Sequence, residues 1–485
     1  MSGLKPARRW QPPFYPFKRE KLGRRVLAAT ERVIKGPLFG CRMCGNCLLQ
    51  ETAFICPMEC PKGMRNGPCG GTTPEKRCYV DETRKCVWYA IYKRSFETGR
   101  QKRLLEVLPP LDYSKTGCET WGDVFRQVKI TGTGKFVSAL FSSDKTRKDK
   151  VWEEVFRTIR QPEWWNGDSE YHKPAYEGPA SELEKKLASG DFVVATELTP
   201  PAGASPEKLI RDIESVKPYV TAINFTDSSS ARAKMSSIAC SSVAVSCGAE
   251  PVLQISSRDN TRTGLQSTAL GLNASGIKNI LCITGDNPVI GSKPTATMNI
   301  IDTDSVQMLW ILRRMRDEGI FLDGRKIKNT PKYFLGAATA PFSSEPEFQA
   351  LKDCKKVNAG AQFFQTNLVF EPYRLGSWLE NLDKLNILDK VYILIGIAPL
   401  KSLKIAEYLH TKVPGVKVPK HIFTRLEKAG ESAPEEGLRI VLEQIEALKG
   451  MKGINGIHIM SLGWESALPG IIRDSGLDKP IMAIR

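Results

Sequence analysis

The sequence predicts an α/β protein in which a small Cys-rich domain precedes a (β/α)8 TIM barrel. Two observations support this fold class. Eight of the 13 Cys lie between Cys41 and Cys86, in a stretch dense in Gly and Pro. From residue 191 onward, short apolar stretches alternate with helical ones, as they do in repeated βαβ units. The chain has 485 residues, which leaves room for two or three domains at roughly 100–200 residues each.

Composition divides the chain into four segments. Residues 1–40 are basic and are expected to form an N-terminal arm, and residues 41–160 hold the Cys-rich metal-binding domain. Residues 161–190 contain Trp, Gly and Pro and are expected to form a linker, and residues 191–485 form the barrel.

The overall charge and hydropathy exclude several classes of protein. The formal net charge is +17 and the pI is about 9.2, which favours acidic partners. We find no nucleic-acid-binding motif and no basic stretch interleaved with aromatics, so nucleic acid is not an expected partner. No apolar run reaches the length of about 18 residues that a membrane span needs. The basic N-terminus shows no secretory signal, so a cytoplasmic protein is expected.

Eight strands are expected in the barrel segment, with helical stretches between them. They are residues 192–196, 220–224, 251–255, 279–284, 332–337, 362–367, 392–397 and 456–460. A closed barrel accounts for eight such units over about 290 residues. The competing fold, a doubly wound open sheet, would place a Gly-rich turn after the first strand, where this chain has Glu-Leu-Thr-Pro-Pro instead.

The spacing of the clustered Cys indicates metal ligands. The cluster consists of Cys41, Cys44, Cys47, Cys56, Cys60, Cys69, Cys78 and Cys86. A C-x2-C-x2-C run followed by a Cys-Pro pair is typical of [4Fe–4S] ligands, and eight Cys suffice for two clusters. The same number would serve one cluster plus zinc, or two zinc sites. The triple spacing and the absence of His from this stretch favour two [4Fe–4S] clusters, and clustered Cys in a cytosolic chain argue against disulfides.

Polar side chains at the ends of five expected strands predict a site at the barrel mouth, where barrel enzymes hold their catalytic residues. These side chains are Glu197, Asn224, Thr226, Asp227, Gln254, Arg258, Asp259, Asn260, Asp286, Thr366 and Asn367. A single polar residue after a strand is commonly a helix N-cap, but capping does not easily explain five strands at once. Two carboxylates facing one pocket, Glu197 and Asp286, would have pKa values pushed apart, with one kept protonated as an acid.

Several of these motifs resemble a known family. The stretches ATELTPPAG (195–203), INFTDSSSARAKMSS (223–237), LQISSRDNTRTGLQS (253–267), ITGDNP (283–288), GAQFFQTNLVFEP (360–372) and IHIMSLGWE (457–465) resemble the barrel of methylenetetrahydrofolate reductases. In addition, GNCLLQETAFICPMECPKGMRNGPCGG (45–71), with the trailing RCYV (77–80) and KCVW (85–88), resembles the Cys-rich partner domain of such reductases from acetogens and related bacteria. All eight clustered Cys fall on that pattern.

The resemblance implies a reaction and roles for individual residues. Reduced flavin would pass hydride from its N5 to the methylene of the folate iminium, so that 5,10-methylenetetrahydrofolate becomes 5-methyltetrahydrofolate. Glu197 matches the family's general acid, and Asp286 matches a carboxylate near the flavin ring that stabilises the developing cation. The positions expected to contact the flavin are Asn224, Thr226, Asp227, Gln254, Arg258, Asp259, Asn260 and Lys356, the last of these pairing with the ribityl phosphate.

Two positions depart from the family pattern. Asn367 stands where the sixth strand usually ends in Gln, which contacts the pterin, and Asn reaches one methylene less. Gln349 stands where FAD-binding relatives carry an Asp near the adenosine half. This second departure favours FMN over FAD as the flavin.

The fusion of a metal domain to a flavin barrel implies a particular electron donor. Clusters deliver single electrons, whereas a flavin stores two and releases them as hydride. We therefore expect a ferredoxin or a larger electron-transfer complex in place of NAD(P)H, and a basic surface would suit an acidic ferredoxin. Two other readings stay open: a non-catalytic barrel acting as a scaffold in an electron-transfer complex, and a pterin-dependent methyltransferase. Homo- or hetero-oligomers are both compatible with the sequence.

Overall fold

The computed structural model describes residues 21–160, 164–165, 167–288, 302–413, 415–479 and 481–484. The chain divides into two compact units. Unit 1 comprises Met1–Pro68 and Asp81–Ser169, and unit 2 comprises Cys69–Val80 and Glu170–Arg485. A short piece of the Cys-rich region, residues 69–80, therefore belongs to the same compact unit as the barrel; we call it the Cys69 segment.

Unit 1 is mainly helical among its described residues. Its elements are α1 (Leu22–Phe39), η1 (Pro57–Glu59), β2 (Asp81–Lys85), α2 (Val87–Glu97), η2 (Gln101–Leu105), η3 (Tyr113–Lys115), α3 (Trp121–Thr131), α4 (Thr133–Leu140) and α5 (Lys145–Arg160). Helices α3, α4 and α5 pack around Ala139, Val151 and Val155. Part of the predicted N-terminal arm is thus helix α1, whereas residues 1–20 lie outside the described residues.

Helix α1 ends at a glycine that fixes where the first Cys lies. Gly40 adopts a left-handed backbone with φ 64°, and its N–H bonds to the carbonyl of Gly36. The N–H of Cys41 bonds to the carbonyl of Lys35. The 5→1 bond of a left-handed glycine is the αL motif, which ends the helix before Cys41.

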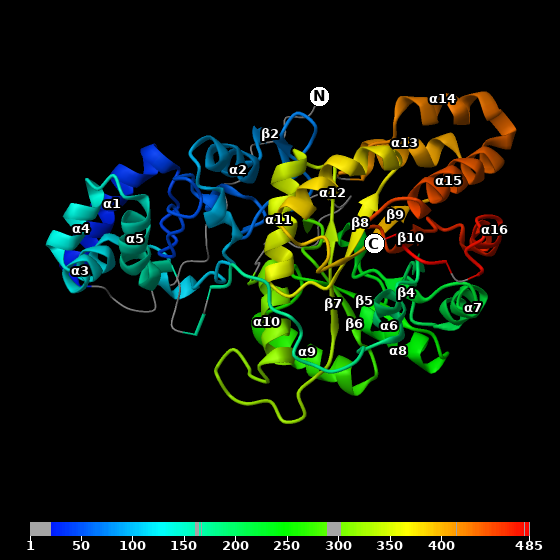
Figure 1. The fold of residues 1–485 in the computed structure, drawn as a ribbon, viewed down its shortest axis with the longest axis horizontal. Coiled ribbons are helices and arrows are strands. Elements are labelled where there is room, and N and C mark those ends of the chain that lie inside the picture. Colours follow the sequence, from blue (N-terminus) through cyan, green and yellow to red (C-terminus); the bar gives the residue numbers. More distant parts are fainter. Residues whose placement is uncertain are drawn as a thin grey trace. The chain divides into compact units, whose positions relative to one another are not determined.

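Unit 2 contains a closed barrel of eight parallel strands (Figure 1). The strands are β3 (Val193–Leu198), β4 (Ala222–Phe225), β5 (Pro251–Ser256), β6 (Asn279–Ile283), β7 (Phe334–Thr339), β8 (Phe363–Leu368), β9 (Tyr392–Ile397) and β10 (Gly456–Met460). They neighbour one another in chain order, and β10 pairs with β3 to close the barrel. The predicted fold class is confirmed. Each expected strand begins and ends within two residues of the corresponding observed strand. The short strand β1 (Arg77–Cys78) lies in the Cys69 segment.

Helices surround the barrel strands (Figure 1). They are α6 (Glu182–Ser189), α7 (Glu207–Val216), α8 (Ser237–Ser246), α9 (Arg262–Ala274), α10 (Ser305–Asp317), α11 (Pro346–Asn358), α12 (Leu375–Lys384), α13 (Leu403–Lys412), α14 (Lys420–Ala429), α15 (Ala433–Lys449) and α16 (Leu468–Asp474). Short 3-10 turns lie at Ser229–Ala231, Pro372–Arg374, Gly430–Ser432 and Glu465–Ala467.

The barrel interior changes from apolar to polar along the strands. At the amino ends, Val193, Ala222 and Phe334 pack in one buried cluster with Leu183 and Leu187 of α6. Side chains alternate between the two faces of a strand, so the inward positions further along are residues such as Glu197, Asn224 and Gln254. We call the carboxyl ends of the eight strands the barrel mouth. An apolar base therefore supports a polar mouth.

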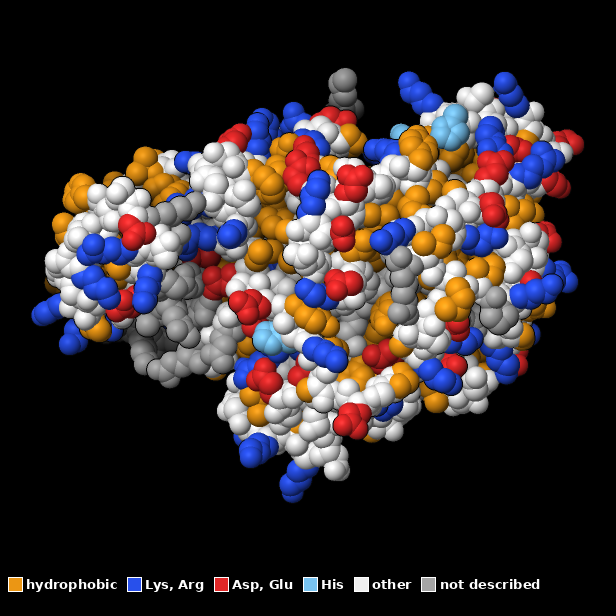
Figure 2. All heavy atoms as spheres, viewed as in Figure 1, with side chains coloured by type: hydrophobic (Ala, Val, Ile, Leu, Met, Phe, Trp, Pro, Cys, Tyr) orange, Lys and Arg blue, Asp and Glu red, His pale blue; other side chains and the backbone are white. Residues whose placement is uncertain are grey.

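The surface carries charges of both signs. On the face shown in Figure 2, Lys and Arg side chains are interspersed with Asp and Glu and do not gather in one patch. Throughout the part of the chain that the structure describes, every helix is too short or too polar to cross a bilayer.

Candidate functional site at the barrel mouth

Glu197 lies near the end of β3 and is the central acidic side chain of the mouth. Its Oε2 accepts a hydrogen bond of 3.1 Å from Nε2 of Gln254 on β5. The side chain is 22% exposed, and burial raises the pKa of its carboxyl to about 7, partly offset by Gln254 and by the charge of Lys234. Because this pKa lies near neutrality, Glu197 can be held protonated and can release its proton at physiological pH.

His458 on β10 is a site residue that the sequence reasoning missed. Its Nε2 lies 4.0 Å from Oε2 of Glu197, and its side chain is only 2% exposed. Burial lowers the pKa of His458 to about 4, so the ring is neutral at physiological pH. Neither ring nitrogen has a hydrogen-bond partner among the described residues. The alternation of side chains along the strand GIHIM (456–460) could have predicted it, because His458 occupies a position that faces the barrel interior.

A pair of amides spans the barrel interior beside Glu197. Asn224 on β4 and Gln365 on β8 bond to each other through both amide groups, at 2.5 and 3.1 Å. Both side chains are buried. Gln365 was not predicted as a site residue. The pair links β4 to β8 across the interior, and each amide keeps a second N–H donor for other contacts.

Three predicted loop residues join neighbouring strand ends. Asp227, after β4, accepts the N–H of Ser256 at 2.9 Å, and burial raises the pKa of its carboxyl. Arg258, after β5, donates to the carbonyl of Asp286 at 3.3 Å and forms an ion pair with Asp259. The loops after β4, β5 and β6 are thus connected by hydrogen bonds.

Two further predicted residues complete these loops. Asn260 donates to the carbonyl of Ser256 at 2.8 Å. The carboxylate of Asp286, after β6, accepts the N–H of Ser230 at 2.7 Å. No hydrogen bond joins Asp286 to Glu197 among the described residues, since Glu197 lies on β3 and Asp286 on the loop after β6.

Asn367 and Thr226 carry buried polar atoms without partners. Nδ2 of Asn367 donates to the carbonyl of Gly415 at 2.9 Å, while its Oδ1 has no partner among the described residues. The hydroxyl of Thr226 also lacks one there. Buried polar atoms normally form hydrogen bonds. A ligand bound at the mouth could form the hydrogen bonds that these two atoms lack within the described protein.

Lys356 and Gln349 lie in a buried polar network of α11. Nζ of Lys356 donates to Asp353 and to the carbonyl of Ala338, both at 2.8 Å. Nε2 of Gln349 donates to Asp353 at 3.0 Å, and Thr339 donates to the same carboxylate at 2.7 Å. These bonds hold the ammonium of Lys356 in a buried position, where the residue is 2% exposed.

The Cys69 segment lies against the loops of the barrel mouth within unit 2. A β-carbon added to Gly415 would lie 2.8 Å from the carbonyl oxygen of Gly70 and 3.5 Å from Nδ2 of Asn367. Lys76 forms an ion pair with Glu345 at 3.2 Å. Tyr79 accepts the N–H of Asn287 and lies close enough to Asp286 to feel its charge, and burial raises the pKa of the tyrosine.

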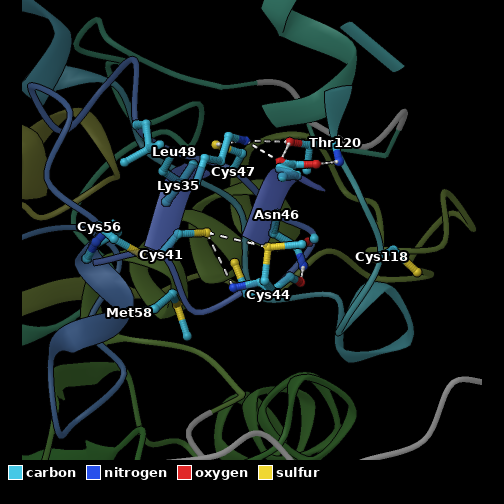
Figure 3. Close-up of a pocket in the computed structure, with 15 residues that line it drawn as sticks. Lys35, Cys41, Cys44, Asn46, Cys47, Leu48, Cys56, Met58, Cys118 and Thr120 are labelled. Carbon is cyan, nitrogen blue, oxygen red and sulfur yellow. Dashed lines mark hydrogen bonds and ion pairs between the residues drawn. The ribbon is translucent and has the colours of Figure 1, made fainter. Parts of the chain in front are cut away.

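In unit 1, four of the predicted metal ligands line one pocket (Figure 3). They are Cys41, Cys44, Cys47 and Cys56, and we call their site the thiol pocket. Cys118 borders the same pocket, with its sulfur pointing away from the others (Figure 3). Burial raises the pKa of the Cys47 thiol to about 11 and that of Cys56 further.

The other four clustered Cys are divided between the two units. Cys60 and Cys86 belong to unit 1, and Cys69 and Cys78 belong to unit 2. Within the described ranges, no three Cys, His, Asp or Glu side chains are arranged as ligands of one metal ion. The structure therefore shows a shared thiol pocket without an assembled ligand shell, and metal binding stays a prediction.

A closed parallel barrel with polar side chains gathered at the carboxyl ends of its strands is the architecture of a TIM-barrel enzyme. A family model described as Methylenetetrahydrofolate reductase matches residues 182–476, more than half of the chain. The chain belongs to the methylenetetrahydrofolate reductase family, which makes it an oxidoreductase acting on a folate, and members of this family generally bind a flavin. A second model, described as Methylene-tetrahydrofolate reductase C terminal, matches residues 23–114, a range that includes all eight clustered Cys.

Two solved structures have a weak similarity to this chain. An uncharacterized protein from Clostridium thermocellum that binds two copies of 5-methyl-5,6,7,8-tetrahydrofolic acid is 15% identical, with a TM-score of 0.42 over 61% of this chain and 99% of that one. Tryptophan synthase from M. tuberculosis is 12% identical, with a TM-score of 0.33 over 61% of this chain and 96% of that one. Likeness at this level carries no conclusion about function. No curated protein matches the chain.

Proposed function

We propose that the chain reduces 5,10-methylenetetrahydrofolate to 5-methyltetrahydrofolate at the barrel mouth, with electrons supplied through its Cys-rich region. Family membership supports the folate reductase activity. The observation that carries the proposal is Glu197, an acid with a pKa of about 7 at the end of β3, held by Gln254.

Glu197 is the proposed general acid. Opening the imidazolidine ring requires a proton on a folate nitrogen, and a carboxylic acid with a pKa near neutrality can both hold and deliver one. Gln254 orients the carboxyl through its amide N–H, and the neutral ring of His458 lies 4.0 Å from the same oxygen of Glu197. Because His458 carries no charge at neutral pH, it does not lower the pKa of Glu197 by charge attraction.

The mouth fits a flavin and a pterin in its polar chemistry. Thr226, Asn367 and His458 present buried atoms without partners among the described residues, and a bound heterocycle can satisfy such atoms. A flavin bound there would supply the hydride. Asp286 is the proposed carboxylate beside the flavin and Asn367 the proposed pterin contact. Lys356, whose ammonium is paired with Asp353 and bonds to the carbonyl of Ala338, remains the proposed partner of the ribityl phosphate.

The remaining predicted flavin contacts have two kinds of proposed role. Asn224 and Gln254 would present amide groups to the ring from inside the barrel. Asp227, Arg258, Asp259 and Asn260 would hold the loops after β4 and β5 in the shape that the cofactor requires, through the hydrogen bonds described above. FMN is favoured over FAD because Gln349 is bound within the α11 network and offers no carboxylate for an adenosine.

The position of the Cys69 segment supports electron entry from the Cys-rich region. Gly70 follows Cys69 directly and packs against Gly415, next to Asn367. Two clustered Cys, Cys69 and Cys78, thereby belong to the compact unit that contains the mouth. A metal centre that uses thiols of this region would supply single electrons, which a ferredoxin or a larger electron-transfer complex can donate. The proposed metal content is two [4Fe–4S] clusters, with one cluster plus zinc as the alternative.

The experiment that tests the proposed function compares electron donors on the full chain. Purified protein is assayed anaerobically for 5-methyltetrahydrofolate, with either reduced ferredoxin or NADH as donor. The expected result is turnover with ferredoxin, which the change Cys44→Ser abolishes. Equal turnover with NADH alone, unaffected by Cys44→Ser, would contradict electron supply through the Cys-rich region while leaving the reductase activity intact.

A further inference from the structure

Lys35 and Glu31 form an ion pair on α1 that is almost completely buried. The two side chains are one helical turn apart, and their residues are 7% and 1% exposed. Removing two charges from water is costly unless further hydrogen bonds satisfy them. The contacts of each charge therefore indicate what the pair does.

The carboxylate of Glu31 is fixed by the start of α3. Its Oε2 accepts the backbone N–H of Thr120 at 2.7 Å and that of Trp121 at 3.3 Å. Its Oε1 accepts the hydroxyl of Thr120 at 2.6 Å. These hydrogen bonds fix the position of the Glu31 carboxylate. The carboxylate then fixes the position of the Lys35 ammonium that pairs with it.

The ammonium of Lys35 points into the thiol pocket (Figure 3). It bonds to Glu31, to the hydroxyl of Thr120 at 2.9 Å, and to Sγ of Cys47 at 3.8 Å. An ammonium has three N–H donors, so these three contacts use all of them. The hydrogen bonds to Glu31 and Thr120 orient the ammonium so that its third N–H points toward the sulfur of Cys47.

Lys35 is the one cation among the described residues that line the pocket. Nearby Arg42 is paired with Glu59 at 2.5 Å, and Arg65 bonds to the carbonyl of Pro109 at 2.9 Å. The pocket thus has one positive charge, which lies between the carboxylate of Glu31 and the sulfur of Cys47.

We propose that Lys35 is a positioning residue for a metal centre in the thiol pocket, orienting the sulfur of Cys47 through an N–H···S bond. Groups that hydrogen-bond to metal ligands orient them and strengthen metal binding. This inference rests on the proposed function, because it requires Cys41, Cys44, Cys47 and Cys56 to be ligands. The inference adds Lys35, which is not one of the clustered Cys, to the residues on which the metal site depends.

Cobalt titration of the full chain tests the inference. Metal is removed with a chelator under reducing conditions, Co²⁺ is added against a competing chelator, and the sulfur-to-cobalt absorption reports thiolate binding. The change Lys35→Met is expected to weaken the pocket's affinity by about 10- to 100-fold, as loss of a ligand's hydrogen-bond partner does elsewhere. Lys93→Met is the matched control, because that lysine is 61% exposed on α2.

Two more variants separate the outcomes. Glu31→Gln keeps the positive charge beside Cys47 but weakens the pair that holds the ammonium in place. It should therefore lower the thermal stability of the metal-free protein and lower cobalt affinity less than Lys35→Met does. Equal losses of affinity in the two variants, in step with equal losses of stability, would assign Lys35 a merely structural role and overturn the inference. Equal affinity in Lys35→Met and Lys93→Met would also overturn it. If Cys44→Ser binds cobalt as wild type does, the proposed metal site itself fails.

Discussion

Oε2 of Glu197 and Nε2 of His458 lie 4.0 Å apart at the mouth of the barrel. Burial moves their pKa values in opposite senses, to about 7 for Glu197 and about 4 for His458. Near neutral pH the pair therefore consists of a neutral imidazole and a carboxyl that is partly protonated. This arrangement suits proton delivery to a bound folate and leads to the first two predictions.

Activity should depend on protonated Glu197. Since burial raises its pKa to about 7, the rate of folate reduction with pre-reduced protein should fall as the pH rises through about 7. Glu197→Gln keeps the shape and loses the proton, and should lower kcat by about 10²–10⁴-fold. Rates measured between pH 5 and 9 check this. A flat profile in wild type, or a Gln variant with normal kcat, would remove Glu197 from its role.

Stability should also depend on Glu197, with a sign set by its raised pKa. The protonated carboxyl stabilises the folded state below the unfolded pKa of about 4.3, and this contribution is lost as the pH rises through about 7. The Gln variant cannot ionise. Relative to wild type, its free energy of unfolding should therefore rise by up to about 3 kcal/mol between pH 5 and 8. Urea unfolding at each pH measures the difference, and His458 is common to both proteins, so its opposite pH dependence cancels.

The amide pair inside the barrel should be sensitive to the loss of one partner. Gln365→Leu leaves the buried amide of Asn224 without its two hydrogen bonds, which should cost about 1–3 kcal/mol of stability. The double variant Asn224→Leu with Gln365→Leu should lose less than the sum of the two single changes. Chemical denaturation of the three variants checks this, and additive losses would show that the two amides do not depend on each other.

Tyr79 should be displaced by a methyl group on Gly71. A β-carbon there would collide with the Tyr79 ring, so Gly71→Ala should shift the tyrosine away from Asn287 and cost about 1–3 kcal/mol. Gly36→Ala is the control, because nothing lies within 4 Å of its added carbon. We expect folate reduction to slow in Gly71→Ala only. Unchanged activity there would mean that the Cys69 segment does not contribute to the mouth.

The sequence predicted the fold well because alternating apolar strands and helices repeat eight times, and the resulting barrel is closed as expected. The sequence also placed Glu197 and Gln254 at the barrel mouth, and the structure joins them across β4, which lies between β3 and β5. The sequence-based prediction missed Gln365 and His458 as site residues, although the register of their strands is enough to show that their side chains face the barrel interior. It could not foresee that Lys35, in a stretch predicted as an arm, lies beside Cys47, because that contact depends on how α1 packs against the start of α3.

The most direct test of the central claim is the reoxidation of reduced flavin by the folate. Protein carrying its flavin is photoreduced without oxygen and mixed with 5,10-methylenetetrahydrofolate while the flavin absorbance is followed. The proposed function predicts rapid return of the oxidised spectrum together with one equivalent of 5-methyltetrahydrofolate, slowed by about 10² or more in Glu197→Gln. A flavin that stays reduced in the presence of the folate, or protein that retains no flavin, would contradict it.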